Sequence, residues 1–93
     1  MKSKILIIDD DQDFVQDLSL LLEGQFQVVT AINEVDGMRI VRENPPEVVL
    51  LDLMLGTSSG LDVLKKIKGE DARLPVIMIT DHASIETAVK AIH

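Results

Sequence analysis

Residues 4–13 read KILIIDDDQD, a short apolar run followed at once by three aspartates. A continuous apolar run of this length is typical of a strand buried on both faces of a parallel sheet. Asp9, Asp10 and Asp11 then set like charges side by side, which costs on the order of 4 kcal/mol for two carboxylates about 4 Å apart at an effective dielectric near 20. Water, a helix N-terminus or a divalent cation could offset this repulsion. We expect Asp11 to cap the helix that follows.

The chain is short and acidic. Its 93 residues are 46% hydrophobic and 27% charged, the composition of a globular protein with one core. Sixteen acidic residues against nine basic ones give a net charge of −7, and no lysine and arginine cluster forms a basic face. We therefore expect no direct binding of nucleic acid. The absence of cysteine excludes thiolate metal sites, and the absence of a signal peptide or a long apolar run predicts a cytoplasmic protein without a membrane contact.

Short apolar runs alternate with helical patterns along the rest of the chain. Strands are predicted at 4–8, 27–31, 47–51 and 76–79, with the 27–31 strand weaker and at an edge. Apolar residues at helical spacing follow each run, namely Phe14, Leu18, Leu21 and Leu22, then Met38 and Val41, then Leu61, Leu64 and Ile67, and finally Ile85, Ala88, Val89 and Ile92. Alternation without hairpin signals predicts right-handed crossovers and a parallel sheet covered on both faces.

Capping and helix-breaking residues mark the ends of these helices. Asn33 suits an N-cap, and Gly24 suits a C-terminal cap. Residues 44–46, Asn-Pro-Pro, should end the second helix, in which Gly37 costs about 1 kcal/mol relative to alanine. Residues 56–60, GTSSG, are predicted to form a loop.

Polar residues stand at the carboxyl ends of three predicted strands. With a strand order of 2-1-3-4, Asp9 and Asp10 would meet Asp52 at the edge of the sheet, and Thr80 would lie one strand further along. Three carboxylates with no histidine or cysteine at the strand ends are hard oxygen ligands suited to Mg²⁺ or Mn²⁺. A carboxylate beside such a cation can act as a nucleophile toward phosphorus. The added charge of about −1.5 to −2 would then reorient nearby loops.

The strand-end residues give the chain a resemblance to a known family. ILIIDD at 5–10, VVLLD at 48–52 and VIMIT at 76–80 resemble the receiver domain of bacterial two-component response regulators, over the whole length given. The resemblance implies a flavodoxin-like, doubly wound α/β fold forming one domain over residues 1–93. TDHASIETAVKAIH at 80–93 is most similar to receivers of the nitrogen-regulation type, which commonly control sigma-54-dependent transcription activators.

The resemblance also implies a role for each site residue. Asp52 is the implied phosphoacceptor and a magnesium ligand, and Thr80 is the hydroxyl that hydrogen-bonds the phosphoryl group. Asp10 is the implied direct magnesium ligand, Asp9 a ligand through water, and the Met54 backbone carbonyl a further ligand. The implied partners are a sensor histidine kinase and either the protein's own output domain or a downstream regulator.

The chain departs from the family pattern in three places. The pattern continues into a fifth strand ending in a lysine that contacts the phosphoryl group, and then a fifth helix, whereas this sequence stops at His93 inside the fourth predicted helix. We expect such a truncated chain to be part of a longer protein, to fold poorly, or to associate as a homodimer or strand-exchanged oligomer through the bare edge at 76–79. Asp81 stands where a small residue is usual. Leu55 and Gly56 stand where Met-Pro is frequent, which predicts a freer loop.

Three functions are compatible with these residues. The first is a signalling domain that takes a phosphoryl group onto Asp52 and switches conformation to control transcription, without turnover of a separate substrate. The second is a degenerate receiver that binds a partner without phosphorylation, which the missing lysine and Asp81 favour. The third is a phosphohydrolase resembling the haloacid dehalogenases, with Asp9 as the nucleophile of a D-x-D pattern, although that family's further motifs are not found here.

Overall fold

A parallel sheet forms the centre of the fold. The computed structural model describes residues 2–56 and 58–79. Within them the sheet contains β1 (Ser3–Ile8), β2 (Phe26–Ala31), β3 (Val48–Asp52) and β6 (Val76–Ile79), in the order β2-β1-β3-β6. Because β6 is the fourth strand of this sheet along the chain, the predicted order 2-1-3-4 is confirmed, as is the place of β2 at an edge. The helix predicted after Thr80 lies outside the described residues.

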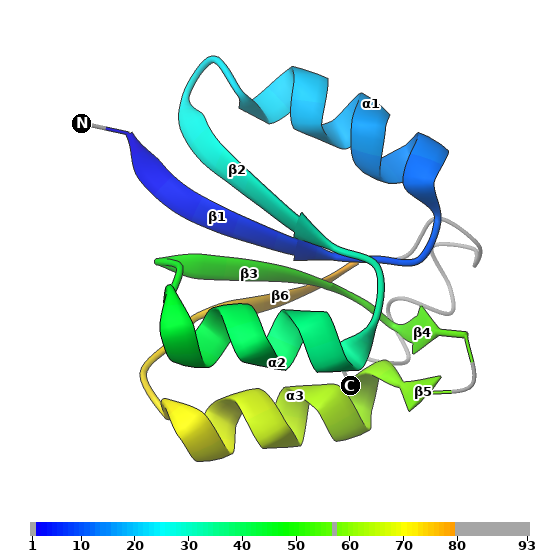
Figure 1. The fold of residues 1–93 in the computed structure, drawn as a ribbon, viewed down its shortest axis with the longest axis vertical. Helices are drawn as coiled ribbons and strands as arrows, with labels where there is room; N and C mark the ends of the chain where they lie inside the picture. The colour runs from blue at the N-terminus through cyan, green and yellow to red at the C-terminus, as the bar shows by residue number, and fades with distance from the viewer. Residues whose placement is uncertain (1, 57, 80–93) are drawn as a thin grey trace.

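Helices cover both faces of the sheet, as predicted (Figure 1). They are α1 (Gln12–Leu22), α2 (Glu34–Glu43) and α3 (Gly60–Glu70). Figure 1 shows α2 and α3 side by side on one face and α1 on the other. β1 serves both faces, because Leu6 and Ile8 pack into the core beneath α2 and α3, whereas Ile5 and Ile7 pack beneath α1. This double burial is the reason why the strand is apolar at every position.

The buried faces of the helices agree with the predicted pattern in part. Met38, Val41 and Ile67 are buried as predicted. Leu21 and Leu61 are not, since they are 80% and 45% exposed, and Val15 and Val63 are buried in the corresponding helices. At 100° per residue, Leu21 lies about 120° around α1 from Val15, and Leu61 lies about 120° around α3 from Ile67. Both leucines therefore point away from the face that contacts the sheet.

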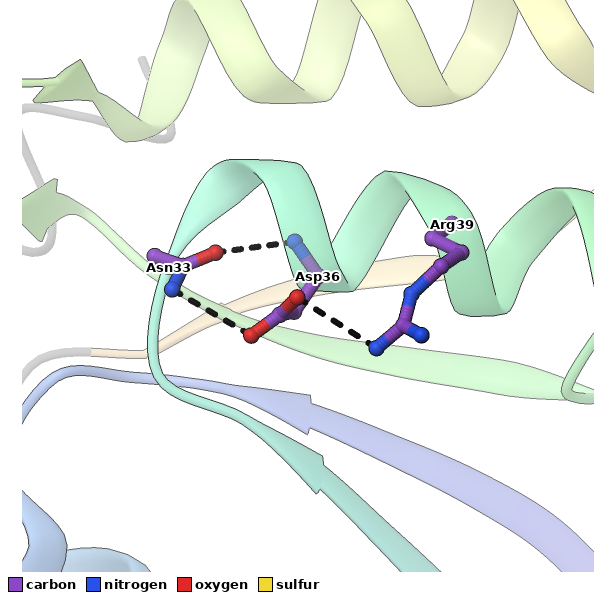
Figure 2. Close-up of polar contacts among 3 residues, drawn as sticks. All are labelled: Asn33, Asp36 and Arg39. Carbon is purple, nitrogen blue, oxygen red and sulfur yellow. Dashed lines mark hydrogen bonds and ion pairs between the residues drawn. The ribbon is translucent and has the colours of Figure 1, made fainter.

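Side-chain caps fix the starts of the helices where the sequence predicts them. Asp11 accepts a hydrogen bond from the Phe14 N–H at 3.1 Å at the start of α1. At the start of α2, Asn33 Oδ1 accepts from the Asp36 N–H at 2.8 Å, and Asn33 Nδ2 donates to Asp36 Oδ2 at 3.3 Å (Figure 2). Arg39 pairs with the same carboxylate at 3.3 Å. α2 ends at Glu43, directly before the Asn-Pro-Pro sequence.

Gly37 brings α2 close to the sheet. A Cβ atom at this position would lie 2.7 Å from Ile8 Cδ1, well inside van der Waals contact. Glycine has a low helix propensity, but a larger residue at this position would collide with Ile8 of β1. The packing of α2 against β1 therefore explains why glycine stands here. No helix within the described residues is long and apolar enough to cross a membrane.

The segment after β3 is a small hairpin and not the plain loop predicted from its sequence. β4 (Met54–Leu55) and β5 (Ser58–Ser59) pair in antiparallel fashion. Gly56, in the turn between them, has φ +56°. Ser59 then caps α3 by accepting from the Leu61 N–H at 3.2 Å. Strands of two residues carry no periodicity, so the sequence pattern does not reveal them.

Candidate functional site

Three aspartates converge at the carboxyl edge of the sheet. Asp9 and Asp10 follow the last residue of β1, and Asp52 is the last residue of β3, the neighbouring strand. One carboxylate oxygen of each residue lies within 4.8 Å of those of the other two. The parallel pairing of β1 and β3 therefore brings together the acids that the sequence places at two separate strand ends.

Asp9 is held inside the protein. Its side chain is fully buried, its Oδ1 accepts from the Asp11 N–H at 2.9 Å, and its Oδ2 accepts no hydrogen bond from the described residues. Burial raises the pKa of Asp9 from 3.8 to about 6, although the hydrogen bond from the Asp11 N–H lowers it. Repulsion from Asp52 and Asp10, and sharing of a proton between the Asp9 and Asp52 side chains, act in the same direction as burial. A cation at this position would offset both the burial and the repulsion.

Asp52 is equally buried and is fixed by the backbone around it. Its Oδ1 accepts from the Met54 N–H at 3.3 Å. The next residue, Leu53, donates its N–H to the Ile79 carbonyl at 2.9 Å and accepts from the Gly60 N–H at 2.8 Å. The end of β3 is thus joined to β6 on one side and to the start of α3 on the other.

Gly60 allows this close approach between β3 and α3. A Cβ atom here would lie 2.3 Å from the Asp52 carbonyl oxygen and 2.7 Å from the Leu53 carbonyl oxygen. Both neighbours are backbone atoms and cannot rotate away. Sequence reasoning assigned Gly60 only to a loop. No local sequence signal marked this role, because it depends on the close approach of α3 to the end of β3.

Asp10 is the exposed member of the cluster and reaches across to the hairpin. Its Oδ2 accepts a hydrogen bond from the Gly56 N–H at 3.0 Å. Gly56, predicted from the sequence only to loosen this segment, therefore makes a specific contact with a site residue. The hydrogen bond connects residues that are 46 positions apart in the sequence.

The other two residues selected from the sequence are placed differently. Met54 contacts the site through its backbone N–H, and its side chain is 62% exposed. Thr80 and Asp81 lie outside the described residues. The structure therefore brings together all three carboxylates selected from the sequence, with the Met54 backbone beside them.

The donor set fits a hard divalent cation. It consists of carboxylate oxygens from Asp9, Asp10 and Asp52, and one buried oxygen of Asp9 accepts no hydrogen bond from the described residues. Buried polar atoms are ordinarily satisfied, so this oxygen indicates a ligand position. Oxygen-only sets of this kind suit Mg²⁺, Mn²⁺ or Ca²⁺ in preference to softer metals. The cluster could therefore bind a metal ion.

Comparisons with known proteins agree with the geometry. The model of the response regulator receiver domain matches residues 5–93. The acid tolerance regulatory protein ActR of Sinorhizobium medicae is 36% identical over 89 residues, which cover 95% of this chain and 46% of ActR. An NtrX-like response regulator of Rickettsia bellii is 37% identical over 91 residues, which cover 95% of this chain and 19% of that protein. The chain thus spans less than half the length of these relatives.

A solved structure shows the same fold. The response regulator receiver domain from Clostridium thermocellum is 35% identical, with a TM-score of 0.82, and the match covers 97% of this chain and 74% of that one. The predicted receiver-like, flavodoxin-like fold is confirmed, and the NtrX-like relative agrees with the predicted nitrogen-regulation type. The chain belongs to the response regulator receiver domain family, whose members are signalling domains of two-component systems.

Proposed function

We propose that this receiver domain accepts a phosphoryl group from a sensor histidine kinase on Asp52 and switches conformation to control transcription. The observation that carries the proposal is the convergence of Asp9, Asp10 and Asp52 at the carboxyl edge of the sheet. Asp52 ends the inner strand β3 and contacts the Met54 N–H, which directs its carboxylate into this cluster. The domain transfers a group to itself and turns over no separate substrate.

The transfer is a displacement at phosphorus. A carboxylate oxygen of Asp52 attacks the phosphorus of the kinase's phosphohistidine, an O–P bond forms, and the P–N bond breaks as its electron pair returns to the imidazole. Asp10 and Asp52 would hold Mg²⁺ directly, Asp9 would hold it through water, and the Met54 carbonyl would complete the protein ligands. Bound there, the ion screens the negative charges of the carboxylates and the phosphoryl group. Thr80 would donate a hydrogen bond to the transferred group.

The change at Asp52 can pass to neighbouring elements through the backbone. Phosphorylation adds a charge of about −1.5 to −2 beside two other acids. The Asp52 carbonyl lies against Gly60, and Leu53 is hydrogen-bonded to both Gly60 and Ile79. Movement of the end of β3 would therefore displace the start of α3 and the end of β6. These elements would present the signal to the protein's own output domain or to a downstream regulator.

The test is to locate the phosphoryl group by residue. The 93-residue chain is incubated with Mg²⁺ and acetyl phosphate, and peptide mass spectrometry then identifies the modified aspartate. We expect one phosphoryl group on Asp52, which Asp52→Asn abolishes and the exposed helix variant Asp62→Asn leaves unchanged. Label on Asp9 would support a haloacid-dehalogenase-like hydrolase. No label on a chain that circular dichroism shows to be folded would support a degenerate receiver that acts without phosphorylation.

A further inference from the structure

We propose that Gly56 is a positioning residue of the cation site, and that its backbone N–H holds the Asp10 carboxylate within the acid cluster. The inference rests on the proposed function for the identity of the site. Its structural basis is the hydrogen bond of 3.0 Å from the Gly56 N–H to Asp10 Oδ2. A receiver with proline at this position would have no N–H with which to make this contact.

Asp10 needs such a contact more than the other two acids do. Asp9 and Asp52 are fully buried, so the packing around them fixes their side chains. Asp10 is exposed and lies beyond the end of β1, and repulsion from Asp9 and Asp52 favours rotation of its carboxylate into water. A hydrogen bond to an ionised carboxylate is stronger than one between neutral groups. The Gly56 N–H can therefore oppose the repulsion in the cation-free protein.

The backbone of Gly56 directs the donor toward Asp10. Its φ of +56° lies in the left-handed region, which residues with a side chain seldom adopt. The residue before it, Leu55, is buried in the core and pairs with Ser58 across the hairpin. The end of the hairpin is held to β3 by the hydrogen bond from Gly60 to Leu53. The donor thus belongs to an anchored turn, which is the arrangement that orients metal ligands effectively.

The test measures cation binding without any phosphoryl transfer. Mn²⁺ is titrated into the 93-residue chain, and electron paramagnetic resonance reports the free ion. Gly56→Pro removes the N–H, Gly56→Ala keeps it but disfavours the positive φ, and Gly56→Asn keeps it with a residue that tolerates this φ. We expect Gly56→Pro to weaken Mn²⁺ binding on the order of tenfold. Gly56→Ala should weaken it less, and Gly56→Asn should bind almost as wild type does.

The controls separate a positioning role from a general effect on the fold. Gly24→Ala alters a glycine with no atom within 4 Å of the added Cβ and should leave Mn²⁺ affinity unchanged. Unchanged affinity in a folded Gly56→Pro variant would overturn the inference, as would a wild-type chain that binds no Mn²⁺. If Gly56→Pro does not fold, a chain in which an ester replaces the Leu55–Gly56 amide lacks the same N–H and decides, and wild-type affinity in that chain would overturn the inference.

The outcome is distinguishable from failure of the proposed function. Loss of Mn²⁺ affinity in Gly56→Pro but not in Gly56→Asn, with no phosphoryl label on Asp52 of the wild-type chain, would support the positioning role and contradict the phosphoacceptor role. Label on Asp52, with Mn²⁺ affinity unchanged in a folded Gly56→Pro variant, would support the phosphoacceptor role and contradict the positioning role.

Discussion

The middle of β1 and two of the acids at the carboxyl edge of the sheet are buried to the same extent but have opposite chemistry. Leu6, Ile7 and Ile8 of β1 are completely buried, and so are Asp9 and Asp52 at the ends of β1 and β3. Burial of the aliphatic side chains stabilises the fold by about 25 cal/mol for each Å² of apolar surface. Burial of like charges at the edge has the opposite effect. Stability at the edge is thus reduced, as the proposed binding of an ion and a phosphoryl group would require.

The largest expected effect concerns the backbone that supports the edge. Gly60→Ala would place a methyl group 2.3 Å from the Asp52 carbonyl oxygen, so β3 and α3 must separate. We expect the free energy of unfolding to fall by about 3 kcal/mol, measured by urea denaturation.

Gly69 provides the matched control because it lies in the same helix and has no atom within 4 Å of an added Cβ. Gly69→Ala should raise the free energy of unfolding by up to about 1 kcal/mol through helix propensity. Equal effects of the two alanines would show that the edge is not held by the contact between Asp52 and Gly60.

The second prediction concerns the charge that the edge buries. The pKa of Asp9 is about 6 in the folded chain against 3.8 in the reference state, so the folded state binds more protons between these values. Without divalent cations, the contribution of Asp9 to the stability of wild type should therefore fall as pH rises from about 4 to about 6. Asp9→Asn removes this contribution and should stabilise the cation-free chain by about 2 kcal/mol at pH 8.

Denaturation in EDTA at several pH values measures this difference, and addition of Mg²⁺ should reduce it. The matched control is Asp17→Asn, which alters an exposed acid on α1. If Asp9→Asn destabilised the cation-free chain at pH 8, the carboxylate would be a structural group and the contrast between core and edge would be wrong.

The two regions also differ in how far sequence predicts them. β1 and β3 are predictable because strands buried on both faces are continuous apolar runs, and Asp9, Asp10 and Asp52 follow from the strand ends and the crossover rule. The predicted position of Leu21 on the buried side of α1 was wrong, because the rotation of a helix about its axis depends on the sheet that it contacts. The role of Gly56 was missed because its N–H meets a carboxylate 46 residues away, and no local pattern reports such a contact.

The smallest expected effect comes from charges outside both regions. Lys66 Nζ lies 2.6 Å from Glu34 Oε1 across the surface between α3 and α2, where the lysine side chain is 58% exposed and the glutamate 24%. Water screens this pair, so a double-mutant cycle with Lys66→Ala and Glu34→Ala should give a coupling of about 0.2–1 kcal/mol. The coupling should shrink as salt is added, because exposed charges are screened. A coupling larger than the gain from Asp9→Asn would contradict the comparison, since it would make an exposed pair of opposite charges matter more to stability than buried charges of like sign.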